Sequence, residues 1–166
     1  MNKILNISTT QSNLRELQPE MGGLLGGNEV FHLEDITEVS QTFVNDSNIK
    51  NGHVCISTLH TTTTILVNEI HEPMLMLDLY RKIESMTPNT LPDYYHNSKY
   101  RTKNLEVCNK HCDTNGAAHL KAMMVGQSHL TLPIIKGKIL LGKWQRIAFI
   151  DFDGPQERKV MLTIIG

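Results

Sequence analysis

The chain has 166 residues and a mass of 18.8 kDa, with 40% hydrophobic and 20% charged residues, which fits a single globular domain. Sixteen basic residues stand against 17 acidic ones, so a nucleic-acid binder that neutralises phosphates and a polybasic membrane-surface protein are both disfavoured. Histidine is the unusual component, with eight residues against four tyrosines and one tryptophan. Because histidine is a common metal ligand and titrates near neutral pH, these eight residues are the first candidates for a site.

The sequence also bears on compartment. No run approaches the roughly 18 apolar residues that a membrane span needs, and residues 1–10 lack the basic and apolar regions of a secretory signal. The chain has three cysteines, Cys55, Cys108 and Cys112. A small and odd number of cysteines does not fit a disulfide framework. We therefore expect a cytoplasmic protein with reduced thiols. The spacing of the Cys/His cluster over 108–112 favours a polar surface loop over a zinc knuckle.

In the first half of the chain, alternation and β-branched residues predict strands, and apolar residues three or four apart predict helices. The predicted strands cover residues 3–9, 29–33, 53–59 and 62–67, and the predicted helices cover 35–45 and 74–86. The pattern leaves open whether residues 53–67 form one long strand or two segments with a bulge. The second helix would place Leu75, Leu79 and Ile83 on one stripe. Residues 11–28 contain four glycines within six positions, which predicts a flexible loop or insertion.

The second half begins with a long polar loop over residues 89–115 and continues with a helix over 116–125. Asp113, Thr114 or Asn115 could cap that helix. The remaining predicted strands cover residues 130–135, 138–141, 144–152 and 159–165. Sequential strands joined by tight turns imply antiparallel pairing, so the predicted class is α+β in a single domain over residues 1–166.

The first candidate site is a histidine followed by four threonines, residues 60–64, with Asn68 and Glu69 after them. On one unbroken strand His60 and Asn68 would share a face. An imidazole with hydroxyls, an amide and a carboxylate nearby could bind a phosphate and a metal. The alternative is a half-exposed threonine-rich strand, which β-propensity alone explains.

Four further places could carry chemistry. His96 lies in the polar loop between aromatic and amide neighbours, where it could be a ligand or a surface residue. His119 lies in the first turn of a small-residue helix, whose N–H groups attract anions, or it is packed on the next strand. Trp144 and Gln145 mark a turn before a strand, although a core anchor is the commoner role of tryptophan. Arg158 could pair with a phosphate, or lie exposed opposite its neighbouring glutamate.

Several common enzyme classes lack support. The chain has no P-loop, dinucleotide fingerprint, HExxH or nucleophile elbow, which disfavours the usual NTPase, Rossmann and zincin assignments. The five other histidines have no companion pattern, and we expect them to be structural or surface residues. They are His32, His53, His71, His111 and His129.

Taken in order, these motifs resemble the YjbQ-like family, which is labelled secondary thiamine-phosphate synthase enzyme. The resemblance rests on residues 60–64, 68–69, 95–97, 119–122, 126–128, 132–133, 137, 142–147 and 158. It covers about residues 29–166, with the loops over 11–28 and 98–114 as additions. Two positions depart from the family pattern. Ala117 stands where many members have a further histidine, and Lys143 stands where a small residue, often threonine, is usual.

The resemblance implies a small α+β domain with a β-sandwich-like core that assembles as a homotrimer. It also implies a site built from His60, His96 and His119, which would suit a divalent, zinc-like ion with an open fourth position. Glu69, Asn68 and His119 would then be catalytic, with Glu69 as a general base or an orienting residue. The implied substrate contacts are Thr61, Lys121, Trp144, Gln145 and Arg158.

The family label implies the joining of a pyrimidine diphosphate to a thiazole phosphate with loss of pyrophosphate. We therefore expect a metal-assisted enzyme acting on phosphorylated metabolites, with a thiamine-phosphate-synthase-like transferase activity. Its partner would be a small phosphorylated molecule, with no nucleic acid and no membrane. The alternatives are a metal-dependent phosphohydrolase and a non-catalytic trimeric ligand-binding protein.

Overall fold

The computed structural model of the chain describes residues 1–14, 29–90, 94–97 and 113–166. Most of the two loops that the sequence marks as additions lies outside these residues, and so does the Cys108–Cys112 cluster. Within the described part, no helix has the length and apolar character needed to cross a bilayer.

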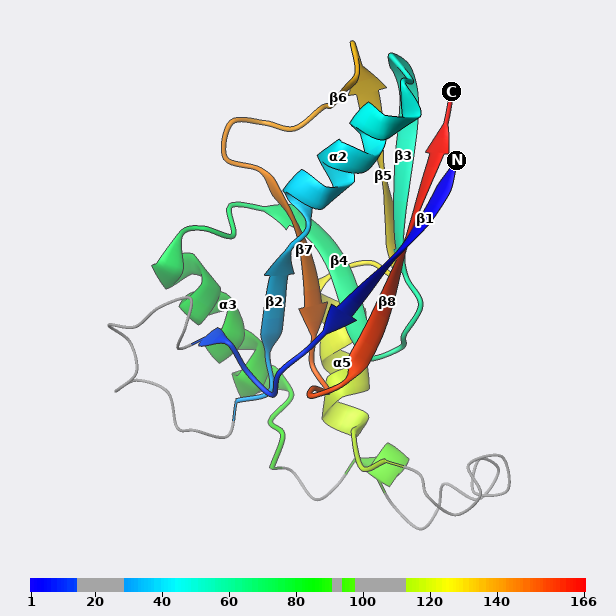
Figure 1. The fold of residues 1–166 in the computed structure, drawn as a ribbon. Helices are drawn as coiled ribbons and strands as arrows, with labels where there is room; N and C mark the ends of the chain where they lie inside the picture. Colours follow the sequence, from blue (N-terminus) through cyan, green and yellow to red (C-terminus); the bar gives the residue numbers. More distant parts are fainter. Residues whose placement is uncertain (15–28, 91–93, 98–112) are drawn as a thin grey trace.

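The described strands form two antiparallel sheets, in agreement with the predicted α+β class (Figure 1). One sheet has five strands in the order β1-β8-β3-β5-β6, and the other has three in the order β2-β7-β4. The strands are β1 (Asn2–Ser8), β2 (His32–Asp35), β3 (Asn51–Thr58), β4 (Thr63–Asn68), β5 (His129–Ile135), β6 (Lys138–Ile139), β7 (Arg146–Asp151) and β8 (Glu157–Ile165). Every predicted strand is present, with small shifts at the ends.

Three α-helices and one short 3₁₀ helix complete the described fold. They are α2 (Thr37–Ser47), α3 (Pro73–Met86), α5 (Gly116–Val125) and the 3₁₀ helix η2 (Tyr95–Asn97). Helix α2 packs against the five-stranded sheet, whereas α3 and α5 pack against the three-stranded sheet (Figure 1). The three-stranded sheet therefore lies between two hydrophobic clusters.

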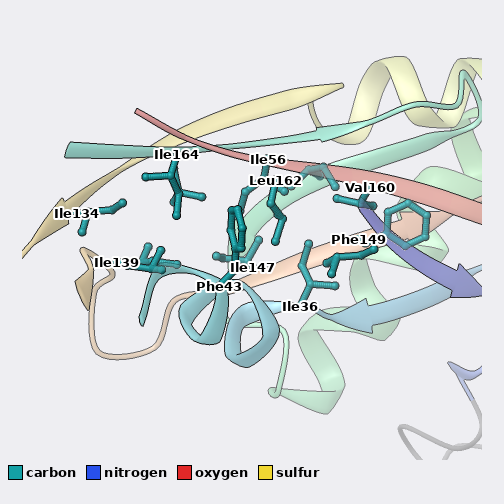
Figure 2. Packing of buried hydrophobic residues seen from close by; sticks show 14 of the residues in the cluster. Ile36, Phe43, Ile56, Ile134, Ile139, Ile147, Phe149, Val160, Leu162 and Ile164 are labelled. Atoms are coloured by element: carbon teal, nitrogen blue, oxygen red, sulfur yellow. The ribbon is translucent and has the colours of Figure 1, made fainter. Parts of the chain in front are cut away.

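Strand β7 belongs to both clusters, and its residues from Ile147 to Asp151 are buried. Phe149 points into the cluster shared with α2 and the five-stranded sheet, near Val160 (Figure 2). Its neighbours Ala148 and Ile150 point into the cluster shared with α3 and α5. Alternate side chains of a strand face opposite sides, so one strand links the two cores.

Two predictions about local structure need correction. Residues 53–67 form two strands in different sheets, because the chain turns at residues 60–62, so His60 and Asn68 do not share a strand face. In α3, Leu75 is 37% exposed, whereas Met76 and Ile83 are buried in the second cluster. After Pro73 the helix has a run of four apolar residues, which does not by itself select the buried face.

Candidate functional site

Helix α5 carries the candidate site, and another segment of the chain packs closely against each of its ends: the η2 segment at the first end and strand β4 at the other. At the first end, a Cβ on Gly116 would lie 2.9 Å from Cβ of Tyr94 and 3.2 Å from Cβ of His96. At the other end, a Cβ on Gly126 would lie 2.9 Å from the carbonyl oxygen of Ile65. Any side chain beyond glycine would push these segments away from the helix.

The approach at the first end brings His96 and His119 together. Their ring centroids are 4.6 Å apart and their planes are inclined by 59°. The two imidazoles line a pocket of about 520 Å³, together with Tyr94, Tyr95, Gly116, Leu120 and Met123. Tyr95 is 83% exposed and Met123 is 75% exposed, so these walls of the pocket are open to solvent.

His96 is connected to buried charge through two other side chains. Its Nε2 lies 3.2 Å from Oδ1 of Asn115, and Nδ2 of Asn115 donates to Oδ2 of Asp153 at 2.8 Å. The same carboxylate oxygen lies 3.7 Å from Nη2 of Arg158. Asn115 thus bridges the histidine pocket and the charged residues around β8.

His60 lines a second pocket, of about 510 Å³, beside the first. The residues around it are Thr58, Leu59, Thr61, Thr63, Ala122, Met123, Gly126 and Ser128. Met123 lines both pockets, so the two adjoin along α5. This second pocket carries several hydroxyl groups, whereas the first is lined mainly by apolar and aromatic side chains.

The ring of His60 already has a backbone partner, because its Nε2 accepts the N–H of Lys159 at 2.9 Å. Burial, followed by the nearby positive charge of Arg158, lowers the pKa of His60 below its ordinary value of 6.5. The ring is therefore neutral at neutral pH. Since Nε2 accepts, its single proton is on Nδ1.

One chain does not assemble the three-histidine centre that the resemblance implies. Among the residues that the structure describes, no three His, Cys, Asp or Glu gather closely enough to hold a metal ion. His96 and His119 form a pair, but His60 faces the neighbouring pocket and uses its ring lone pair for the Lys159 N–H. A single chain thus offers two of the three implied ligands together.

The two cations implied as substrate contacts are held inside the fold. Lys121 is 1% exposed, and its Nζ donates to Glu84 at 2.5 Å and to Asn89 at 2.6 Å. Arg158 donates from Nε and Nη2 to the two oxygens of Asp151, at 2.8 and 3.0 Å. Neither cation lines either pocket. Both are held by partners within the fold, and their contact with a substrate stays a prediction.

Four other implied residues, Asn68, Glu69, Trp144 and Gln145, lie at the end of the three-stranded sheet away from His60. Thr63 begins β4 near His60, whereas Asn68 ends the strand about 17 Å away at 3.3–3.4 Å per residue, and Glu69 follows it. The antiparallel register places the start of β7 beside Asn68, so Trp144 and Gln145 belong to this end as well. The connection between β6 and β7 indeed lies far from α5 (Figure 1).

The residues near His60 and the residues at the Asn68 end of the sheet differ in what they offer a ligand. Thr61 lines the second pocket with His60. Trp144 is 62% exposed and is not a core anchor. The side-chain oxygen of Gln145 accepts the N–H of Gly142 at 2.7 Å, which closes the turn before β7. Neither of the two pockets joins the two groups.

Sequence reasoning missed Asn115 as a site residue and treated it only as one of three possible helix caps. The structure places it at the N-cap position of α5 but shows no side-chain capping bond. Its partner Asp153 is 38 positions away, so no local spacing could reveal the contact. Met123 was equally hidden, because an apolar residue in a short apolar helix is expected in a core.

The comparisons with known proteins agree on one family. The family model described as UPF0047 protein YjbQ-like matches residues 27–166. A UPF0047 protein of Methanothermobacter thermautotrophicus is 34% identical over 137 residues, which are 81% of this chain and 82% of that protein.

Solved structures show the same fold. A hypothetical protein of Aeropyrum pernix superposes with a TM-score of 0.73 at 27% identity, covering 100% of this chain and 98% of that one. A YbjQ-like protein of unknown function from Sulfolobus solfataricus gives 0.72 at 29% identity, with 100% and 96% covered. The chain therefore belongs to the UPF0047 protein YjbQ-like family.

Proposed function

We propose that this protein is a small enzyme that acts on phosphorylated metabolites, with His96 and His119 as its catalytic pair. The observation that carries the proposal is the 4.6 Å separation of the two rings at an open pocket. Histidine can accept or donate a proton near neutral pH. With two adjacent imidazoles, one can act as a base while the other acts as an acid.

The shape of the site suggests how a substrate lies in it. The pocket of His60 offers hydroxyl groups, including those of Thr61 and Ser128, as partners for phosphate oxygens. The pocket of the histidine pair offers Tyr94, Leu120 and other apolar surface to the organic part. We place the phosphorylated end in the hydroxyl-lined pocket and the reacting bond beside the histidine pair, with Met123 between them.

The family label makes a transferase the first activity to test, with pyrophosphate released as two thiamine precursors are joined. Phosphate ester hydrolysis is a second candidate, because the exposed walls at Tyr95 and Met123 leave the pair accessible to water. In hydrolysis, water forms a bond to phosphorus as the ester P–O bond breaks. One imidazole takes the proton from water and the other gives a proton to the leaving oxygen.

A divalent, zinc-like ion is a separate part of the proposal, and no step above depends on it. His96 and His119 would supply two ligands, and a third would have to come from a second copy in the implied homotrimer. Metal analysis of protein purified without added zinc tests this part. We expect bound metal in the unchanged protein and its loss in His119→Ala. An active protein that contains no metal would show that the metal part of the proposal is wrong.

Turnover of a substrate panel tests the function itself. The panel contains a pyrimidine diphosphate with a thiazole phosphate, and a series of phosphate monoesters, with released pyrophosphate and phosphate as readouts. We expect His96→Ala and His119→Ala to lower turnover by about 10²–10⁴-fold while circular dichroism stays unchanged. His53→Ala is the matched control, since His53 is exposed on β3 and lines neither pocket. Tight ligand retention without turnover would instead favour the non-catalytic binding protein.

A further inference from the structure

Asn115 occupies a position in which its side chain would ordinarily cap a helix. Asparagine is among the preferred N-cap residues because its side-chain oxygen accepts an N–H of the first turn. Here Asn115 makes no such bond. Instead, the N–H of Gly116 donates to Oδ1 of Asn97 at 2.9 Å, from the neighbouring η2 segment. Asn97 thus serves part of the capping role, and the side chain of Asn115 turns to other partners.

The orientation of the Asn115 amide follows from its contact with Asp153. An ionised carboxylate only accepts hydrogen bonds, so the atom 2.8 Å from it must be the amide nitrogen. Asp153 is itself held in place, because its backbone N–H donates to Asp151 at 3.0 Å and its carbonyl oxygen accepts from Arg158 at 3.3 Å. The buried Arg158–Asp151 pair therefore holds Asp153 in place, and Asp153 in turn orients the Asn115 amide.

This orientation decides the state of the His96 ring. With its nitrogen on Asp153, Asn115 presents its carbonyl oxygen to Nε2 of His96, 3.2 Å away. A carbonyl oxygen only accepts, so Nε2 must carry the proton and donate it. A neutral imidazole has one N–H, so the lone pair is then on Nδ1.

We infer that Asn115 is a positioning residue that sets the tautomer of His96, with Asp153 setting the orientation of Asn115. The hydrogen-bond chain Asp153–Asn115–His96 stands on the geometry alone. Its meaning for catalysis rests on the proposed function: it makes Nδ1 the basic atom of His96.

Nuclear magnetic resonance of chelator-treated, metal-free protein with ¹⁵N-labelled histidine tests the inference without any substrate. At about pH 8.5, above the ordinary titration range of histidine, two-bond nitrogen–proton couplings distinguish the two neutral tautomers. We expect His96 in one tautomer, with the proton on Nε2. In Asp153→Ala, which leaves every His96 contact atom in place, the amide can flip, and we expect both tautomers.

Asp153→Glu is the matched control, because its carboxylate can still only accept from Asn115, and it should keep the single tautomer. Asn115→Ala removes the amide while Asn97 still caps the helix, so it gives a second route to the same mixture if Asp153→Ala does not fold. An unchanged single tautomer in a folded Asp153→Ala or Asn115→Ala protein would overturn the inference, and so would a proton on Nδ1 in the unchanged protein.

Activity provides a separate readout. If only a fraction of molecules holds the active tautomer, kcat falls in proportion, by about twofold or more in Asp153→Ala, and recovers in Asp153→Glu. Failure of the proposed function is distinguishable from failure of this inference. A protein that turns over no substrate but holds His96 in one Asn115-dependent tautomer would reject the first and keep the second.

Discussion

Arg158 donates two hydrogen bonds to Asp151, whose side chain is fully buried, and a third to the hydroxyl of Thr62 at 3.2 Å. Removing one member of a buried pair leaves the other charge unpaired, which costs about 3–5 kcal/mol. We therefore expect Arg158→Met to lower the free energy of unfolding by about that amount in urea titrations. Arg158→Lys should lose less, because it keeps the charge but not the two-pronged geometry.

The neighbouring Lys159 provides the control, since it is exposed and its backbone rather than its side chain contacts His60. Lys159→Met should change stability by no more than about 0.5 kcal/mol. If Arg158→Met kept its stability and only weakened the binding of a phosphorylated ligand, Arg158 would be a substrate contact after all.

His60 should make stability depend on pH. Its folded pKa lies below 6.5, mainly because it is buried and near Arg158. As the pH falls below about 6.5, the unfolded chain binds a proton at His60 that the folded chain refuses, so stability falls. The loss stops once the pH passes below the folded pKa.

The comparison with His60→Gln isolates this effect, because glutamine can still accept the Lys159 N–H but does not titrate. We expect unfolding free energies measured between about pH 7 and pH 5 to fall more steeply for the unchanged protein. Parallel curves for the two proteins would show that His60 titrates as it does in the unfolded chain.

At the scale of elements, the contact between α5 and β4 depends on Gly126. The backbones of Ile65 and Gln127 exchange two hydrogen bonds there, at 2.8 and 3.1 Å, and a Cβ would collide with Thr64 and Ile65. We expect Gly126→Ala to destabilise the fold by about 1–3 kcal/mol, as overpacking does. Thermal unfolding measures this change.

Gly142→Ala is the fitting comparison, because its Cβ would meet only the flexible end of Gln145, at 3.2 Å. It should be much better tolerated than Gly126→Ala. Equal losses for the two variants would mean that the close approach of α5 to β4 is not what Gly126 provides.

Most elements could be predicted from the sequence because their signals are local. The spacing of apolar residues located α2, cap residues located α5, and strand-like runs located β1 and β8. The turn at residues 60–62 could not be predicted, since threonines there have the same strand preference as their neighbours. Only the choice of partners, β5 and β8 for β3 but β7 for β4, breaks the strand.

At the scale of the whole molecule, the sequence likewise predicted residues of the site but not how the fold arranges them. The resemblance supplied His96 and His119, which the fold brings together, but sequence order contains no distances. It could not reveal that Asn68, Glu69 and Trp144 lie at the far end of the β4–β7 ladder from His60. A homotrimer in which one end of a chain meets the other end of its neighbour would reunite the two groups.

Mixing of inactive variants tests this arrangement. If His119 and Glu69 of different copies form one site, His119→Ala and Glu69→Gln proteins should each be inactive alone. Refolded or co-expressed together, they should regain part of the activity, because some interfaces then contain both native residues. A monomer in sedimentation experiments, or no recovery in mixed oligomers, would contradict a shared site.

The most direct test of the central claim is a double-mutant cycle on the histidine pair, measured as kcat/KM for the best substrate of the phosphorylated panel. If His96 and His119 act as one catalytic unit, each alanine variant loses most of the activity and the double variant loses little more. Wild-type turnover by the double variant would contradict the claim, and so would two independent losses that simply multiply.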